Sequence, residues 1–244
     1  MIVNEKDKIS SINSSRPLLI MLPFAGGSSY SYKNIIKPLQ HDFDILCPEL
    51  PGRGALLNEP LIKDLHELVE HVFTNWIKPL QLKRPYVLFG HSMGALLGYL
   101  LAHSLMKNQL PLPIHLVVSG REEPMYIDED EPTFSLSSSQ FRDKIREYGG
   151  LSDTILNDPE LMEYFDPILR ADFEAVERYR PVPLDPLDIP ITVLYGSQED
   201  IAPGSVLLWN QASKRIVRIM QMPGDHFFIF DNAREIVNYL KSLK

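Results

Sequence analysis

Short, continuous apolar runs alternate with amphipathic segments along this chain. The runs cover residues 18–22, 43–47, 86–89, 114–120, 191–195 and 216–222. A run that is apolar at every position suits a central strand covered by helices on both faces. The intervening segments at 29–39, 64–79, 93–106 and, after the last run, 233–243 are expected to be helical. This alternation predicts an α/β fold with a mostly parallel central sheet, right-handed crossovers and helices on both faces.

The alternation is interrupted between residues 121 and 185. Three helical segments are expected there, at 138–148, 153–157 and 159–180. Such an insertion is too long to be a simple crossover. We therefore expect a helical lid over the ends of the strands, where ligands bind in open α/β sheets. The chain is expected to form one domain, residues 1–244, with a core of about 17–120 and 186–244 and a lid of about 121–185.

Residues 86–98 form a strand–turn–helix segment around the sequence Gly-His-Ser-Met-Gly. This is the context of a G-x-S-x-G nucleophile elbow. Gly90 and Gly94 have a steric role, because the strand and the helix come so close that a side chain at either position would occupy their contact. Ser92 is then held at a helix N-terminus, which favours developing negative charge.

A serine hydroxyl needs a base, and histidine suits this role near pH 7. His226 is the only histidine in a tight, glycine-containing turn that directly follows an expected strand. Asp200 follows the preceding strand and is the expected acid, so the chain order is Ser92, Asp200, His226. This order is that of the α/β-hydrolase fold. The competing acids are Glu199, Asp225, Glu122 and Glu123.

Two backbone N–H groups are candidates for an oxyanion hole. One belongs to Met93, directly after the serine, and the other to Ala25, in the Gly- and Ser-rich loop 24–29. Arg53 lies in a rigid turn and is expected to be a solvated loop charge. Candidates for lining the substrate pocket or lid are Phe24, Arg170 and Phe227.

Composition narrows the class of protein. The net charge of −8 over 244 residues disfavours nucleic acid as the main partner. Cys47 is the only cysteine and is expected to be a small buried side chain, which excludes an internal disulfide. Residues 1–16 are polar, without the apolar segment of a signal peptide, and no apolar run reaches membrane-spanning length. We expect a cytoplasmic protein without a membrane contact.

With these motifs the chain resembles the type II thioesterases of nonribosomal peptide and polyketide synthesis. The resemblance covers nearly the whole chain and rests on residues 22–27, 49–54, 89–95, 119–121, 167–173 and 224–228. Residues 169–173, Leu-Arg-Ala-Asp-Phe, are the most specific, because general hydrolases do not share them. The chain departs from the family pattern at Asp166 before Pro167 and at Glu122-Glu123 before Pro124.

The resemblance implies hydrolysis of acyl thioesters from the phosphopantetheine arm of carrier proteins, which removes wrongly loaded or stalled groups. It implies the partner, an acyl or peptidyl carrier domain, and we expect a monomer. No metal or other cofactor is expected. Arg170 and Asp172 are expected to form an ion pair that fixes the lid. The alternatives are a medium-chain fatty acyl thioesterase, a hydrolase of acyl-CoA or small esters, and a catalytically silent carrier-binding protein.

Overall fold

A computed structural model describes residues 2–3, 15–127 and 131–244. Within these ranges seven strands form one sheet in the order β1-β3-β2-β4-β5-β6-β7, and every neighbouring pair is parallel. The strands are β1 (Ile2–Val3), β2 (Leu18–Leu22), β3 (Asp44–Leu46), β4 (Tyr86–His91), β5 (His115–Ser119), β6 (Ile191–Gly196) and β7 (Val217–Met222). The predicted parallel sheet is confirmed. Most of the expected N-terminal leader lies outside the described residues.

The central strands are buried on both faces, as their continuous apolar runs predict. In β2, Leu18, Ile20 and Leu22 pack into the core on one face. Leu19 and Met21 point to the opposite face and pack there. Successive side chains of a strand alternate between faces, so a strand covered on both sides must be apolar throughout.

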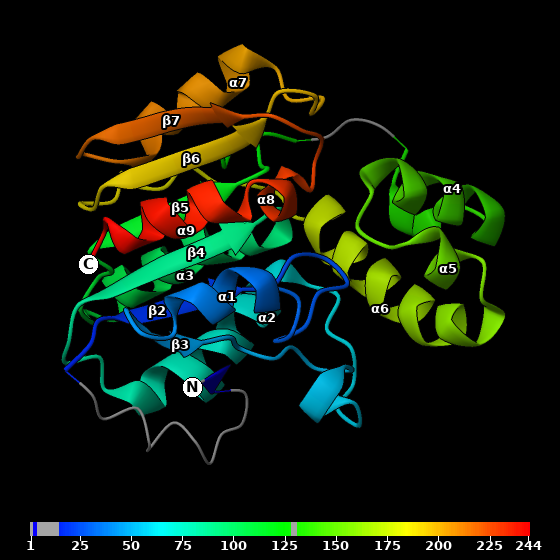
Figure 1. The fold of residues 1–244 in the computed structure, drawn as a ribbon, viewed down its shortest axis with the longest axis horizontal. Coiled ribbons are helices and arrows are strands. Elements are labelled where there is room, and N and C mark those ends of the chain that lie inside the picture. Colours follow the sequence, from blue (N-terminus) through cyan, green and yellow to red (C-terminus); the bar gives the residue numbers. More distant parts are fainter. Residues whose placement is uncertain (1, 4–14, 128–130) are drawn as a thin grey trace.

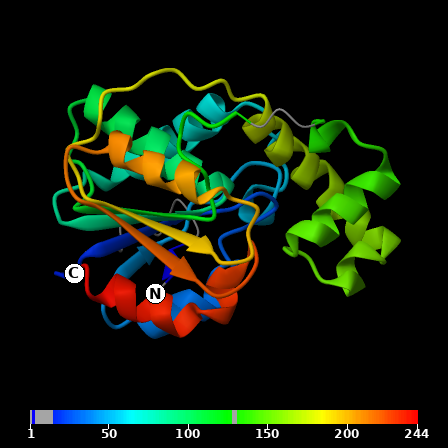
Figure 2. The ribbon, with the colours of Figure 1, turned by 90° about the horizontal axis from the view of Figure 1, so that it is seen from above.

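Helices cover both faces of the sheet (Figures 1 and 2). One face carries α1 (Lys33–Leu39), α8 (Phe228–Asp231) and α9 (Ala233–Lys241). The other carries α2 (Leu65–Val72), α3 (Met93–Lys107), α7 (Pro203–Leu207) and η6 (Leu208–Ala212).

Two expected helices differ from the structure. The helix expected over 29–39 begins only at Lys33, because residues 28–32 are used in tight turns. The helix expected over 64–79 is α-helical to Val72 and continues as a π turn, η3 (Phe73–Ile77), and a 3₁₀ turn, η4 (Lys78–Leu80). Pro79 has no N–H to continue the regular hydrogen bonding.

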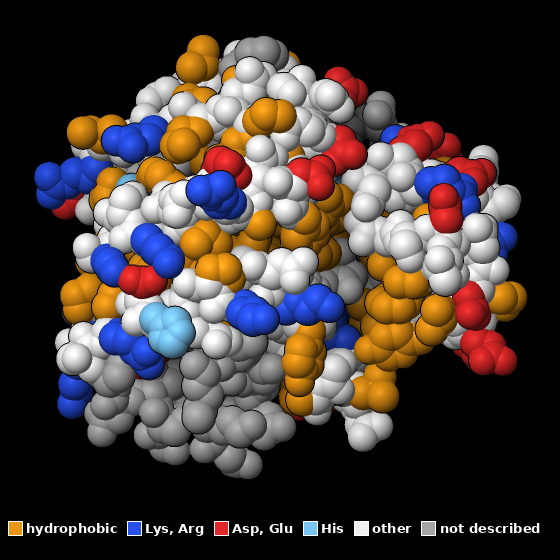
Figure 3. All heavy atoms as spheres, in the orientation of Figure 1, with side chains coloured by type: hydrophobic (Ala, Val, Ile, Leu, Met, Phe, Trp, Pro, Cys, Tyr) orange, Lys and Arg blue, Asp and Glu red, His pale blue; other side chains and the backbone are white. Residues whose placement is uncertain are grey.

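The segment expected to form the lid, residues 121–185 and called the lid segment below, holds η5 (Thr133–Ser135), α4 (Ser138–Tyr148), α5 (Asp153–Leu156) and α6 (Pro159–Glu177). These helices lie beside the carboxyl ends of the strands (Figures 1 and 2). They have a small apolar cluster of their own, formed by Phe141, Ile145, Leu156, Met162 and Leu169. The space-filling view shows a hollow between these helices and the core, with apolar side chains on the helical side (Figure 3).

No helix in the described part of the chain is long and apolar enough to cross a bilayer.

Candidate active site

Ser92 lies between β4 and α3 in a strained backbone conformation, with φ 55° and ψ −120°. Non-glycine residues rarely adopt it, at a cost of about 1–3 kcal/mol. The Ser92 N–H donates to the carbonyl of Ser119, at 2.8 Å, which ties the turn to β5. A Cβ on Gly90 would lie 2.0 Å from the Gly94 carbonyl oxygen, and one on Gly94 would lie 2.4 Å from that of Leu22. The expected contact between strand and helix is confirmed at Gly90, whereas Gly94 lies against the end of β2. The segment has the geometry of a nucleophile elbow.

His226 lies in the turn after β7, next to the elbow. Its ring centroid is 4.8 Å from that of His91, the residue before Ser92. Its Nδ1 lies 2.7 Å from Oε1 of Glu199, whose side chain is 2% exposed. Because a carboxylate accepts, Nδ1 carries a proton, and in the neutral imidazole Nε2 then keeps its lone pair. The buried carboxylate of Glu199 therefore fixes the orientation of the His226 ring.

The carboxylate that contacts His226 is that of Glu199 and not, as expected, that of Asp200. The second oxygen of Glu199, Oε2, accepts the Gly196 N–H at 2.5 Å, so the carboxylate is fixed at two points. Asp200 is exposed on the outside of the same turn. The turn is itself held to the loop after β7, since the Gln198 N–H donates to the carbonyl of Gly224 at 2.9 Å. Two adjacent acids point in different directions in a tight turn, and the sequence alone did not show which one faces inward.

Among the described residues no hydrogen bond joins the Ser92 hydroxyl to His226. Such catalytic contacts are often loose without substrate and tighten in the complex. His91 is fully buried, and its Nδ1 lies 3.1 Å from the Ser119 hydroxyl. Burial, and beyond it the charge of His226, hold the pKa of His91 well below its ordinary value. His91 therefore remains neutral beside His226 and does not compete for its proton.

The hydrogen bonding of the protein is compatible with the oxyanion hole expected at Met93 and Ala25. Within the described residues neither the Met93 N–H nor the Ala25 N–H donates a hydrogen bond to the protein. The Gly26 N–H is not free, because it donates to Oδ2 of Asp172 at 2.7 Å. The Ala25 N–H, one residue earlier, has no such partner among the described residues.

Arg53 and Arg170 do not lie where the sequence suggested. Arg53 is not solvated, because its side chain is 2% exposed and forms a bidentate ion pair with Asp172. Arg170 pairs instead with Asp166, at 2.8 Å, four residues earlier in α6. The expected Arg170–Asp172 ion pair is therefore wrong. On a helix, neighbours on one face are three or four positions apart, and residues two apart diverge.

The pocket candidates separate into two groups. Phe24 and Phe227 lie at the site, with ring centroids 5.1 Å apart, and the Phe227 ring is 5.2 Å from that of His226. Arg170 lies within the lid helices, over the ring of Phe141 at 4.1 Å. Sequence reasoning missed Tyr148, at the end of α4, whose ring centroid is 5.7 Å from that of His226. No local pattern marks this residue, because helix packing brings it there.

A second acid lies near the Glu199–His226 pair. Burial raises the pKa of Glu122. The charge of Arg121 lowers this pKa, and the charge of Glu199 raises it. Glu122 was one of the competing acids, and no hydrogen bond joins it to His226 in the described part of the chain. Across the same residues, no group of three or more His, Cys, Asp or Glu side chains converges as metal ligands would.

The parallel sheet, the elbow after β4 and the histidine after the last strand define an α/β-hydrolase. The thioesterase domain family model matches residues 17–243. The gramicidin S biosynthesis protein GrsT of Aneurinibacillus migulanus is 30% identical over 233 residues, which cover 95% of this chain and 90% of that protein. The human medium-chain S-acyl fatty acid synthase thioesterase is 31% identical, over 91% of this chain and 85% of that protein.

Among solved structures, the type II thioesterase BorB from the borrelidin biosynthetic cluster superposes with a TM-score of 0.86. It is 28% identical, over 95% of this chain and 94% of that one. The chain belongs to the thioesterase domain family, and the expected enzyme class, a thioester hydrolase, is confirmed. The resemblance to type II thioesterases is confirmed as well.

Proposed function

We propose that this chain hydrolyses acyl thioesters carried on the phosphopantetheine arm of carrier-protein domains, with Ser92, His226 and Glu199 as its catalytic residues. One observation carries this proposal. The buried Glu199 carboxylate holds the His226 imidazole with Nδ1 protonated, beside a serine in a strained elbow. This is the arrangement by which a histidine activates a serine and then protonates the leaving group.

Two acyl transfers complete the reaction. In the first, the Ser92 oxygen bonds to the thioester carbonyl carbon and its proton passes to Nε2 of His226. The carbon–sulfur bond then breaks, and His226 returns the proton to the departing thiolate. In the second, His226 removes a proton from water as the water attacks the acyl-serine. The carbon–oxygen bond to Ser92 breaks, the acid leaves, and Ser92 regains its proton.

The carbonyl oxygen becomes negatively charged in both steps. The free N–H groups of Met93 and Ala25 are proposed to stabilise this charge, together with the N-terminus of α3. A thiolate is a good leaving group, so the chemistry needs no further acid than the His226 imidazolium.

Carrier-bound substrates are proposed because of the relatives in biosynthetic clusters. GrsT belongs to gramicidin S biosynthesis and BorB to the borrelidin cluster, and both match over nearly their whole length. We propose that this chain likewise removes wrongly loaded or stalled acyl groups in trans.

A comparison of three substrates tests the carrier. The same short acyl group is offered on a carrier protein, on CoA and as a simple ester, and kcat/KM is measured for each. The carrier-bound thioester is expected to react fastest, because only it presents the protein surface as well as the arm. Equal kcat/KM on all three would contradict a role in carrier editing.

The human relative supports a second candidate, release of medium-chain fatty acyl groups. The same assay, run with acyl groups of increasing length, distinguishes the two. A rate that rises steeply toward medium chains would favour chain release over editing.

A further inference from the structure

Helix α6, which belongs to the lid segment, contacts the turn at residues 24–27 in the core. Two of its side chains meet Gly26. Asp172 accepts the Gly26 N–H, and a Cβ added to Gly26 would lie 2.5 Å from Cδ2 of Leu169. This turn also carries Ala25, the proposed oxyanion donor. A helix that is distant in sequence thus sits directly on part of the catalytic machinery.

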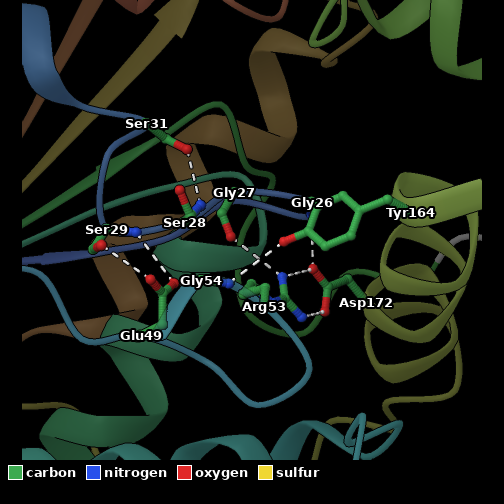
Figure 4. Close-up of polar contacts among 10 residues, drawn as sticks. All are labelled: Gly26, Gly27, Ser28, Ser29, Ser31, Glu49, Arg53, Gly54, Tyr164 and Asp172. Atoms are coloured by element: carbon green, nitrogen blue, oxygen red, sulfur yellow. Dashed lines mark hydrogen bonds and ion pairs between the residues drawn. The ribbon is translucent and has the colours of Figure 1, made fainter. Parts of the chain in front are cut away.

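The Asp172–Arg53 pair is buried and closely fitted (Figure 4). Arg53 Nη1 lies 2.6 Å from Asp172 Oδ2, and Nη2 lies 2.7 Å from Oδ1. The Asp172 side chain is 0% exposed. A buried carboxylate needs such pairing, because an unpaired charge inside a protein is strongly disfavoured. Asp172 is therefore fixed in one position, with its Oδ2 directed at Gly26.

Both sides of the turn are held by this pair. Asp172 accepts the Gly26 N–H at 2.7 Å, and Arg53 Nη1 donates to the Gly27 carbonyl at 3.3 Å. The turn closes by a hydrogen bond from the Gly27 N–H to the Phe24 carbonyl, at 2.8 Å. Gly26 has φ 75°, the conformation of the third residue of a type II turn.

A turn with two adjacent glycines is easily rearranged, because glycine tolerates almost any backbone conformation. Rotation of the Ala25–Gly26 peptide would direct the Ala25 carbonyl toward Asp172, and the carboxylate would repel it. Asp172 thus selects the orientation of this peptide in which the Gly26 N–H is used, and it anchors the turn one residue from the Ala25 N–H.

We propose that Asp172 is a positioning residue for the oxyanion hole: through Gly26 it holds the 24–27 turn so that the Ala25 N–H faces the carbonyl oxygen attacked by Ser92. Arg53 fixes Asp172 in this role. The lid helix is thereby part of the catalytic geometry and not only a cover. This inference rests on the proposed catalytic function of Ser92, but it does not depend on the carrier.

Asp172→Asn tests the proposal, with Arg53→Lys as a second variant. Asparagine keeps the shape but cannot satisfy both Gly26 and the guanidinium fork. Lysine keeps the charge but loses the bidentate contact. Because one whole oxyanion donor is worth about 10²–10³ in kcat, we expect Asp172→Asn to lower kcat about 10- to 100-fold. Arg53→Lys should lower it less, and KM should change about twofold or less.

A second ion pair between α6 and the core provides a matched control. Lys63 Nζ lies 3.2 Å from Oε2 of Glu174, two residues after Asp172, and this pair does not touch the turn. Glu174→Gln therefore removes a link between the same helix and the core without changing the oxyanion loop. It should leave kcat nearly unchanged, and circular dichroism and thermal unfolding establish which variants are folded.

The decisive readout is the binding of a transition-state mimic. An alkyl boronic acid forms a tetrahedral, negatively charged adduct with Ser92, whereas the product carboxylate mimics a ground state. Asp172→Asn should weaken boronic acid binding by about the factor lost in kcat and leave carboxylate binding unchanged. Unchanged boronic acid affinity in both folded variants, or an equal loss in Glu174→Gln, would overturn the proposal.

A p-nitrophenyl ester of a short fatty acid serves as substrate in these assays. Failure on carrier-bound thioesters would then count against the carrier proposal alone. The ratio of variant to wild type on the ester still decides the role of Asp172.

Discussion

A carboxylate can orient a catalytic histidine only if it is itself held in place. Glu199 meets this condition because one oxygen accepts from Gly196 and the other from His226, in a side chain that is almost fully buried. Asp200 is one residue further and faces solvent. The two neighbouring side chains thus point in different directions, Glu199 toward His226 and Asp200 toward solvent. Substituting each one separately tests which of them is the acid.

Glu199→Gln should lower kcat about 10²- to 10⁴-fold, because the amide no longer stabilises the imidazolium and can favour the wrong tautomer. Asp200→Asn should leave kcat within about twofold of wild type, since its carboxylate is solvated and apart from His226. Steady-state hydrolysis of one acyl thioester by both variants provides the comparison. A loss in Asp200→Asn as large as that in Glu199→Gln would refute Glu199 as the acid.

Some residues of the site could be found from the sequence, and others could not. Ser92 and His226 stand in turns with distinctive local patterns, so their neighbours identify them. Glu199 shares its turn with another acid, and only the folded backbone separates the two. The Arg53–Asp172 pair joins positions 119 apart, and no local pattern connects such residues.

At the scale of elements, the elbow depends on how closely a strand and a helix approach each other. Strand β4 and helix α3 meet at Gly90 and Gly94, where even a Cβ would overlap backbone atoms. The continuous apolar runs identified these elements because burial on both faces leaves no polar position. The ends of these elements were less predictable. Helix α1, for example, begins at Lys33 and not at residue 29, because tight turns precede it.

Gly90→Ala should lower the free energy of unfolding by about 1–3 kcal/mol, because the added Cβ forces the strand and the helix apart. Activity should fall with it, since the same shift moves Ser92. Gly204→Ala is the matched control, because nothing lies within 4 Å of its added Cβ and it is in helix α7. That variant should be about 0.5–1 kcal/mol more stable. Urea unfolding measures both, and equal effects of the two substitutions would contradict the steric explanation.

At the scale of the whole molecule, the site is assembled from distant segments at one edge of the sheet. The elbow follows β4, the proposed acid follows β6 and the proposed base follows β7. Helix α6 reaches the turn at residues 24–27 from the side (Figures 1 and 4). In a parallel sheet the carboxyl ends of the strands share an edge, so the sequence order already placed the first three together. The docking of α6 depends on buried contacts across the chain and required the structure.

In the proposed reaction, Ser92 carries the acyl group between the two transfers. The most direct measurement is mass spectrometry of the protein and of an acylated carrier after mixing, with wild type and with Ser92→Ala. We predict that wild type releases the acyl group and passes through an acyl adduct on the peptide containing Ser92. The alanine variant should form no adduct and should leave the carrier acylated. Undiminished release by Ser92→Ala would contradict the account.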